Sequence, residues 1–174
     1  MPTKNAQKHL ETAIADAVIQ LQTSAQFGIA ADQRATSLAG TLLQTATALS
    51  AALFGWSAVN TISITVIVVA AVAIGGMFIG GVICVLSASP ATFYSAGNPP
   101  DFWRWQIDKK KTYPEALSSQ LDEYKDKIEN NTRTVSKNAR MFKMGALIGS
   151  IAPLLSSLTL LAIYVWQYLA NCHY

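Results

Sequence analysis

Charged residues are sorted along this chain into two blocks, and the stretches between and after these blocks hold none. All thirteen Lys and Arg and all ten Asp and Glu lie in residues 1–34 and 101–143. Soluble domains scatter their charges over every surface element. A lipid bilayer excludes them, because a charge in hydrocarbon costs several kcal/mol. The pattern therefore predicts an integral membrane protein.

Composition excludes several other classes of protein. The net charge of +3 is too small to indicate nucleic-acid binding. The two cysteines, Cys84 and Cys172, supply no disulfide framework or metal cluster. The two histidines, His9 and His173, are far apart and have no ligand spacing around them. No Ser–His–Asp set and no glycine-rich phosphate loop occurs. We expect no enzyme activity, no metal and no resident cofactor.

Hydrophobic periodicity predicts an all-α fold with four segments. These are a cytoplasmic amphipathic helix (1–34), a transmembrane hairpin (35–88), a cytoplasmic aromatic and basic loop with a coiled-coil-like helix (89–143), and a transmembrane helix with a short external tail (144–174). Lys and Arg are confined to one side of the three expected spans. The positive-inside rule therefore places the N-terminus in the cytoplasm and the C-terminus outside.

The first span, Thr36 to Trp56, is unusually polar for a lipid-facing helix. We expect a stripe of Ser37, Thr41, Thr45 and Ala48 to be hidden against other helices or water. Two interpretations stay open. The Ser, Thr and Gln face packs between helices, or it lines an aqueous path when several copies assemble.

Small residues also mark the other two spans. Gly76 and Gly80 form a GxxxG pair in the second span, and Gly145 and Gly149 recur on one face of the third. Such pairs let helix backbones approach closely. We expect all four to be packing residues and the protein to be a homo-oligomer.

A continuous helix is predicted from Pro114 to Leu169, with a kink at Pro153. Its apolar positions alternate four and three residues apart, as in a coiled-coil seam. The seam consists of Leu117, Leu121, Tyr124, Ile128, Asn131, Val135, Asn138 and Phe142, and the same register continues through Gly145 and Gly149. Each asparagine either fixes the register of the packed helices or faces water where the seam frays.

The loop expected from Ser89 to Thr112 is rich in aromatic and basic residues. Its candidate ligand-binding residues are Trp103, Arg104, Lys109, Lys110 and Lys111. Indoles stack on bases and lysines neutralise phosphate. The alternative is an interfacial belt, with aromatic side chains at headgroup depth and lysines attracted to anionic lipid.

Three stretches together resemble a known family: GIAADQRATSLAG (28–40), FYSAGNPPDFW (93–103) and IENNTRTVSKNAR (128–140). An Asp-x-Arg-Ala entry to a membrane hairpin, before a long cytoplasmic helix that leads into the membrane, resembles the small transmembrane effectors of bacterial antiphage systems. Among these, the chain is most similar to the Pycsar transmembrane effectors and the related SLATT-type proteins.

The resemblance implies a function and a set of residues. In that family a cyclase makes a cyclic pyrimidine nucleotide, such as cUMP or cCMP, and the effector then impairs the inner membrane and causes abortive infection. Asp32, Arg34 and Ala35 match the hairpin entry, and Asn131 and Lys137 match the long helix. Asp32 and Arg34 are then switch residues, or they simply stop the first span from sliding. No separate nucleotide-sensing domain is recognisable. The nucleotide sensor therefore lies either within these helices or on a partner protein.

Two hypotheses of function follow. In the first, a dormant oligomeric effector becomes leaky when a ligand binds its cytoplasmic helices. In the second, a constitutive membrane scaffold recruits a cytoplasmic partner through those helices. A holin-like role is a third hypothesis. The charged cytoplasmic insertion is larger than that role requires.

Overall fold

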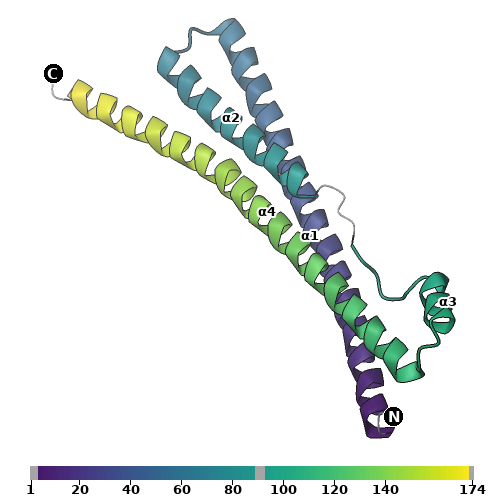
Figure 1. Cartoon of the computed structure of the whole chain (residues 1–174). Helices are drawn as coiled ribbons and strands as arrows, with labels where there is room; N and C mark the ends of the chain where they lie inside the picture. Colours follow the sequence, from purple (N-terminus) through teal and green to yellow (C-terminus); the bar gives the residue numbers. More distant parts are fainter. Residues whose placement is uncertain (1–3, 89–92, 173–174) are drawn as a thin grey trace. The chain divides into compact units, whose positions relative to one another are not determined.

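The computed structural model describes residues 4–88 and 93–172, and every regular element in these two ranges is a helix (Figure 1). The helices are α1 (Lys4–Val59), α2 (Ile64–Ser87), α3 (Pro100–Asp108) and α4 (Tyr113–Cys172). The prediction of an all-α fold is confirmed for the described residues.

Two of the helices are very long. α1 has 56 residues and α4 has 60. The sequence of α1 contains no proline, so nothing interrupts its hydrogen bonding between the polar and the apolar segment. α4 contains Pro153, yet the helix continues past it to Cys172. The predicted continuity of the charged helix with the last apolar stretch is confirmed.

The chain divides into two compact units. The charged unit consists of residues 4–31 and 93–137, and the apolar unit consists of residues 32–88 and 138–172, counting the described residues. α1 and α4 contribute to both units, whereas α2 belongs to the apolar unit and α3 to the charged unit.

The core of the charged unit joins the apolar side of the predicted amphipathic helix, in α1, to the predicted seam of α4. Ala17 and Leu21 of α1 are buried with Tyr124 of α4. Partly buried apolar residues pack around them: Ile14, Val18, Ala96, Leu121 and Ile128. The thin apolar stripe of α1 therefore finds its partner within the same chain.

The apolar unit packs α1 through alanine rather than through the predicted polar stripe. The buried positions of α1 there are Ala35, Ala39, Leu42 and Ala46. The stripe of Ser37, Thr41, Thr45 and Ala48 is exposed, so no other helix of this chain covers it. That it is hidden against other helices or water stays a prediction. Thr41 and Thr45 donate to carbonyls of their own helix, at 3.1 and 2.8 Å. Alanine also lets the backbones of neighbouring helices approach each other more closely than larger side chains do.

The expected loop from Ser89 to Thr112 is wrong over nine residues, because α3 forms there. Pro99 and Pro100 suggested a break in the chain. Pro99 instead occupies the N-cap position and Pro100 the first helical position, where the missing N–H of proline costs nothing. Asp101 in the first turn favours the same helix start.

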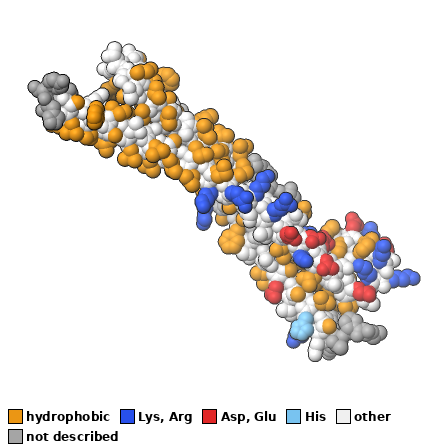
Figure 2. All heavy atoms as spheres, turned by 60° about the vertical axis from the view of Figure 1, so that its left-hand side comes forward, with side chains coloured by type: hydrophobic (Ala, Val, Ile, Leu, Met, Phe, Trp, Pro, Cys, Tyr) orange, Lys and Arg blue, Asp and Glu red, His pale blue; other side chains and the backbone are white. Residues whose placement is uncertain are grey.

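Among the described residues, three helices are long and apolar enough to cross a membrane. Their most apolar windows, in α1, α2 and α4, have mean hydropathies of 1.3, 2.6 and 2.0. On the face shown in Figure 2, hydrophobic side chains crowd one part of the surface that shows no acidic or basic ones, and Lys, Arg, Asp and Glu gather on the rest. An apolar surface of this extent marks a membrane or protein contact.

Candidate functional site

The turn between α3 and α4 places three consecutive lysines at the end of a helix. The Lys111 N–H donates to the Gln106 carbonyl at 3.1 Å, and the Lys110 N–H donates to the Ile107 carbonyl at 2.9 Å. These two bonds form a Schellman motif, with Lys110 at the left-handed position that glycine usually occupies. Lys110 has a φ of 51°. A lysine there costs about 1 kcal/mol relative to glycine.

α4 begins immediately after this turn with one half of a capping box. The backbone N–H and the hydroxyl of Thr112 both donate to the Glu115 carboxylate at 2.8 Å. The backbone bond, then the hydroxyl bond, and finally the charge of Lys111 lower the pKa of Glu115. The box satisfies a backbone donor that the helix itself leaves unpaired.

The lysines line a hollow of about 560 Å³ in the charged unit. Its lining residues are Lys109, Lys110, Lys111, Glu115, Ser118 and Ser119. The Lys111 ammonium donates to the Ser119 hydroxyl at 2.9 Å. Three ammonium groups and two hydroxyls surround one carboxylate, so the hollow is suited to an anion.

The structure brings together only part of the predicted ligand-binding set. Lys109 and Lys111 lie 5.2 and 4.8 Å from the centre of the Trp105 ring, within cation–π distance. Trp103 instead packs edge-on against Phe102. Trp103 and Arg104 are exposed residues of α3 and do not line the hollow.

Gln106 lies behind the same helix end and is buried, with 2% of its surface exposed. Neither polar atom of its side-chain amide has a partner among the described residues. A buried unsatisfied amide is costly and calls for an explanation, such as water or a bound group.

A strap of six residues, 93–98, crosses the α1–α4 pair of the charged unit and is held by Asn131. This side chain is fully buried (0% exposed). Its amide donates to the Tyr94 carbonyl at 3.0 Å and accepts from the Tyr94 N–H at 2.9 Å. It also donates to the Ser24 hydroxyl of α1 at 3.2 Å. Of the two interpretations of Asn131, the structure supports the one that fixes a register; Asn138 is half-buried.

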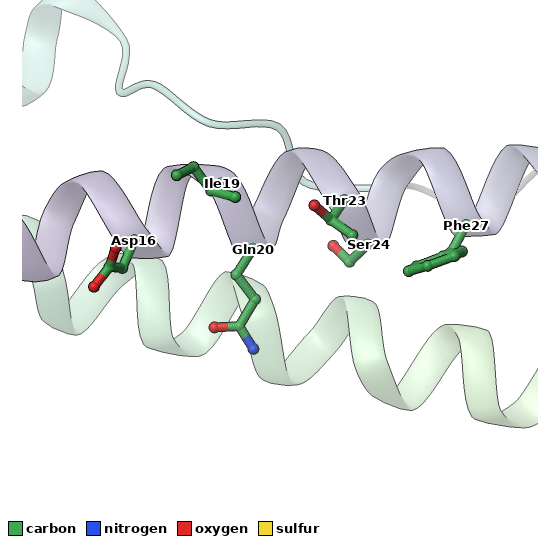
Figure 3. Close-up of a pocket in the computed structure, with 6 residues that line it drawn as sticks. All are labelled: Asp16, Ile19, Gln20, Thr23, Ser24 and Phe27. Carbon is green, nitrogen blue, oxygen red and sulfur yellow. The ribbon is translucent and has the colours of Figure 1, made fainter.

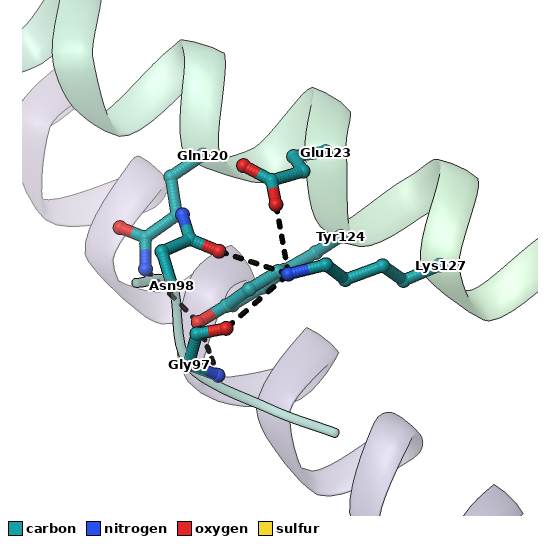
Figure 4. Close-up of polar contacts among 6 residues, drawn as sticks. All are labelled: Gly97, Asn98, Gln120, Glu123, Tyr124 and Lys127. Carbon is teal, nitrogen blue, oxygen red and sulfur yellow. Dashed lines mark hydrogen bonds and ion pairs between the residues drawn. The ribbon is translucent and has the colours of Figure 1, made fainter. Parts of the chain in front are cut away.

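A second set of hydrogen bonds holds the other end of the strap (Figure 4). The Tyr124 hydroxyl accepts from the Gly97 N–H at 3.0 Å. The Lys127 ammonium donates to the Gly97 carbonyl at 3.2 Å and to the Asn98 side-chain oxygen at 3.0 Å, and it pairs with Glu123 at 2.8 Å. Sequence reasoning missed Tyr124 and Lys127 as functional residues. Tyr124 on the predicted seam was the one available signal, since a buried tyrosine hydroxyl needs a partner.

Gly28 makes room for the first residue of the strap. A Cβ added at Gly28 would clash with the ring of Phe93. The absence of a side chain therefore lets the strap lie directly on α1.

α1 carries a further hollow in the charged unit, of about 330 Å³ (Figure 3). All six lining residues come from this one helix: Asp16, Ile19, Gln20, Thr23, Ser24 and Phe27. Ile19 and Phe27 are 61% and 66% exposed. Two large exposed apolar side chains beside polar ones are typical of a protein contact.

The predicted packing glycines meet inside the apolar unit. A Cβ added at Gly80 would lie 2.6 Å from the backbone nitrogen of Gly149 and 2.6 Å from the Gly145 carbonyl oxygen. Gly76 lies against Ala152. The structure therefore brings all four glycines to the contact between α2 and α4 of one chain.

The predicted switch residues are divided between the units. Asp32, half-buried, and Arg34, exposed, belong to the apolar unit. The Asp32 carbonyl accepts from the Thr36 hydroxyl at 2.9 Å. Asn131 and the exposed Lys137 belong to the charged unit. Over residues 4–88 and 93–172, no group of three or more His, Cys, Asp or Glu side chains is placed to hold a metal ion.

No family model, no curated protein and no solved structure matches this chain.

Proposed function

We propose that this chain is an effector of the bacterial inner membrane, in which an anionic ligand bound at the lysine hollow changes the packing of membrane-spanning helices. The observation that carries the proposal is the sharing of two helices between the units. α1 and α4 form the core of the charged unit, and the same two helices pack with α2 in the apolar unit.

The chemistry of the lysine hollow supports a phosphate-bearing ligand. Its volume of about 560 Å³ lies within the range of small-molecule sites. Lys109, Lys110 and Lys111 supply charge-assisted donors to phosphate oxygens. Trp105, 49% exposed, lies beside them and offers a ring on which a base can stack. A cyclic pyrimidine nucleotide, the ligand class of the effectors that the sequence resembles, has both groups.

The backbone of Lys110 supports the same proposal. A left-handed position at a helix end is most stable with glycine. The chain keeps a lysine there despite the cost, which is typical of strain retained at functional sites.

In this proposal the three apolar helices span the membrane with the charged unit in the cytoplasm. The ligand shifts an equilibrium between a closed and a leaky arrangement of helices. Moving such an equilibrium from 1:99 to 99:1 requires about 5.5 kcal/mol of differential binding energy. Several charge-assisted bonds to phosphate can supply this amount.

Binding and activity test the proposal together. Binding of cUMP and cCMP to the full-length protein in detergent is measured by calorimetry, with Lys109→Gln/Lys110→Gln/Lys111→Gln as the test variant. Lys125→Gln, at an exposed lysine outside the hollow, is the control. We expect the triple variant alone to lose binding. In cells, co-expression with a cyclic-pyrimidine cyclase should depolarise the membrane only when the hollow is intact. Membrane potential that does not change at confirmed expression of both proteins would refute the effector function.

A second candidate function is a constitutive membrane scaffold. The observation that favours it is the α1 hollow with its exposed Ile19 and Phe27. In that case Phe27→Ser should abolish recruitment of a cytoplasmic partner, and the cyclase should leave membrane potential unchanged.

A further inference from the structure

The apolar part of α1 carries a second face that the chain itself leaves open. Its positions alternate four and three residues apart, and all of them are exposed: Ser37, Thr41, Gln44, Ala48, Ala51 and Gly55. This spacing is the seam of two packed helices. The face differs from the buried one, through which Leu42 and Leu43 contact Gly149 and Gly81 within the chain.

Most polar side chains of this segment are satisfied without a partner. Between Thr36 and Trp56, five hydroxyl groups donate to the carbonyl four residues earlier, at 2.8 to 3.1 Å: Thr36, Thr41, Thr45, Thr47 and Ser50. Such bonds let a threonine or serine face hydrocarbon. Ser37 lies one turn from Arg34, at the charged end of the segment.

Gln44 is different, because its amide has two donors and an acceptor that the helix cannot satisfy. It lies ten residues beyond Arg34 and twelve before Trp56, near the middle of the apolar segment. The side chain is exposed and forms no hydrogen bond within the described parts of the chain. An unpaired amide in hydrocarbon costs several kcal/mol.

We infer that this face binds a second copy of the chain, with the Gln44 side chains of the two copies hydrogen-bonded to each other. A carboxamide is self-complementary, since it donates and accepts at once. A two-fold axis through the contact places each Gln44 beside its symmetry mate. Alanine and glycine on the same face allow the backbones to approach closely, and Gly55 has open space where a Cβ would lie.

The inference rests on the proposed function only in needing α1 to lie in a bilayer. Its first test is disulfide cross-linking of the full chain in vesicles of phosphatidylethanolamine and phosphatidylglycerol. The background is Cys84→Ala/Cys172→Ser, and the two test variants add Ala48→Cys or Thr47→Cys. These neighbours are both exposed, lie at nearly the same depth and differ by 100° around the helix. We expect oxidation to cross-link Ala48→Cys and not Thr47→Cys.

Its second test removes the amide. Förster transfer between labelled chains in the same vesicles, measured over a range of protein-to-lipid ratios, gives the dimer dissociation constant. Gln44→Leu should weaken the dimer about five-fold to ten-fold. Thr47→Leu, the control at the same depth, should leave it unchanged.

The outcomes separate this inference from the proposed function. If the protein does not float with the vesicles, both fail. If it floats but the two cysteine variants cross-link equally, or neither does, the assigned face is wrong. If Gln44→Leu dimerises as tightly as the parent protein, the amide does not join the copies.

Discussion

The Asn131 side chain pairs with both backbone polar groups of Tyr94, accepting from its N–H at 2.9 Å and donating to its carbonyl at 3.0 Å. One side-chain amide thus pairs with both backbone polar groups of Tyr94, as the backbone of a neighbouring β-strand would. The third bond, to Ser24 of α1, joins the strap, α1 and α4 in the charged unit.

Replacing Asn131 with alanine should detach the strap. The change leaves the Tyr94 groups without their partner, and we expect the free energy of unfolding in detergent to fall by about 1–3 kcal/mol. Amide hydrogen exchange at Tyr94 should accelerate in parallel. The control is Asn130→Ala, at the exposed neighbouring position, for which we expect a change within about 0.5 kcal/mol.

Asn131→Asp separates the two roles of the amide. A carboxylate still accepts from the Tyr94 N–H but cannot donate to the Tyr94 carbonyl. Because the carboxylate is also buried and faces the Tyr94 carbonyl oxygen, the strap should be protected less than in the parent protein and no better than in Asn131→Ala. If Asn131→Ala and Asn130→Ala lower the free energy of unfolding equally, the Asn131 bonds do not hold the strap.

Lys110→Gly should stabilise the fold while weakening the site. Glycine removes the cost of the left-handed φ of 51° at the end of α3, so the free energy of unfolding should rise by about 0.5–1 kcal/mol. Affinity for a phosphate-bearing ligand should fall, because one of three ammonium groups is lost. Chemical denaturation and calorimetry measure the two effects. A variant with both higher stability and undiminished affinity would show that Lys110 does not contribute to ligand binding.

Much of the packing could be predicted from the sequence, because helical periodicity reports burial directly. The seam predicted for α4 includes the buried Leu117, Tyr124 and Asn131, and it continues to Gly145 and Gly149. What Asn131 binds could not be predicted. Tyr94 and Ser24 lie 37 and 107 residues away along the chain, and only the folded register brings them together.

One error has an identifiable physical cause. α3 was expected to be a loop, because the same proline pair can break a helix or begin one. The Ser37, Thr41, Thr45 and Ala48 stripe is exposed in the single chain, and the sequence does not say whether other helices or water cover it. Bonds from Thr41 and Thr45 to their own helix satisfy these two hydroxyls in either case.

The start of α4 should lose stability in acid. The pKa of Glu115 is lowered, first by the Thr112 backbone bond, so the carboxylate is more stable in the folded than in the unfolded chain. Its contribution is therefore complete above the ordinary pKa of a glutamate, and it is lost as pH falls through the lowered pKa. The protection of the Thr112 amide against hydrogen exchange, relative to its intrinsic exchange rate at each pH, should fall over that interval.

Glu115→Gln tests the assignment of this pH dependence. A neutral glutamine still accepts a hydrogen bond but does not titrate, so the acid-dependent change at Thr112 should disappear. Glu129→Gln, at an exposed glutamate further along the same helix, should retain it. Loss of protection in acid that persists in Glu115→Gln would assign the effect to another group.

Gly80 and Gly75, five residues apart in α2, should respond oppositely to alanine. A methyl group at Gly80 would lie 2.6 Å from the Gly149 backbone, which cannot move aside as a flexible side chain can. We expect Gly80→Ala to lower the free energy of unfolding in detergent by about 1–3 kcal/mol. A Cβ at Gly75 meets nothing within 4 Å, so Gly75→Ala should raise it by up to about 1 kcal/mol through helix propensity. Thermal unfolding followed by circular dichroism measures both. Because the Gly80 contact lies within one chain, its effect should not depend on protein concentration; a concentration-dependent effect would place Gly80 between copies instead.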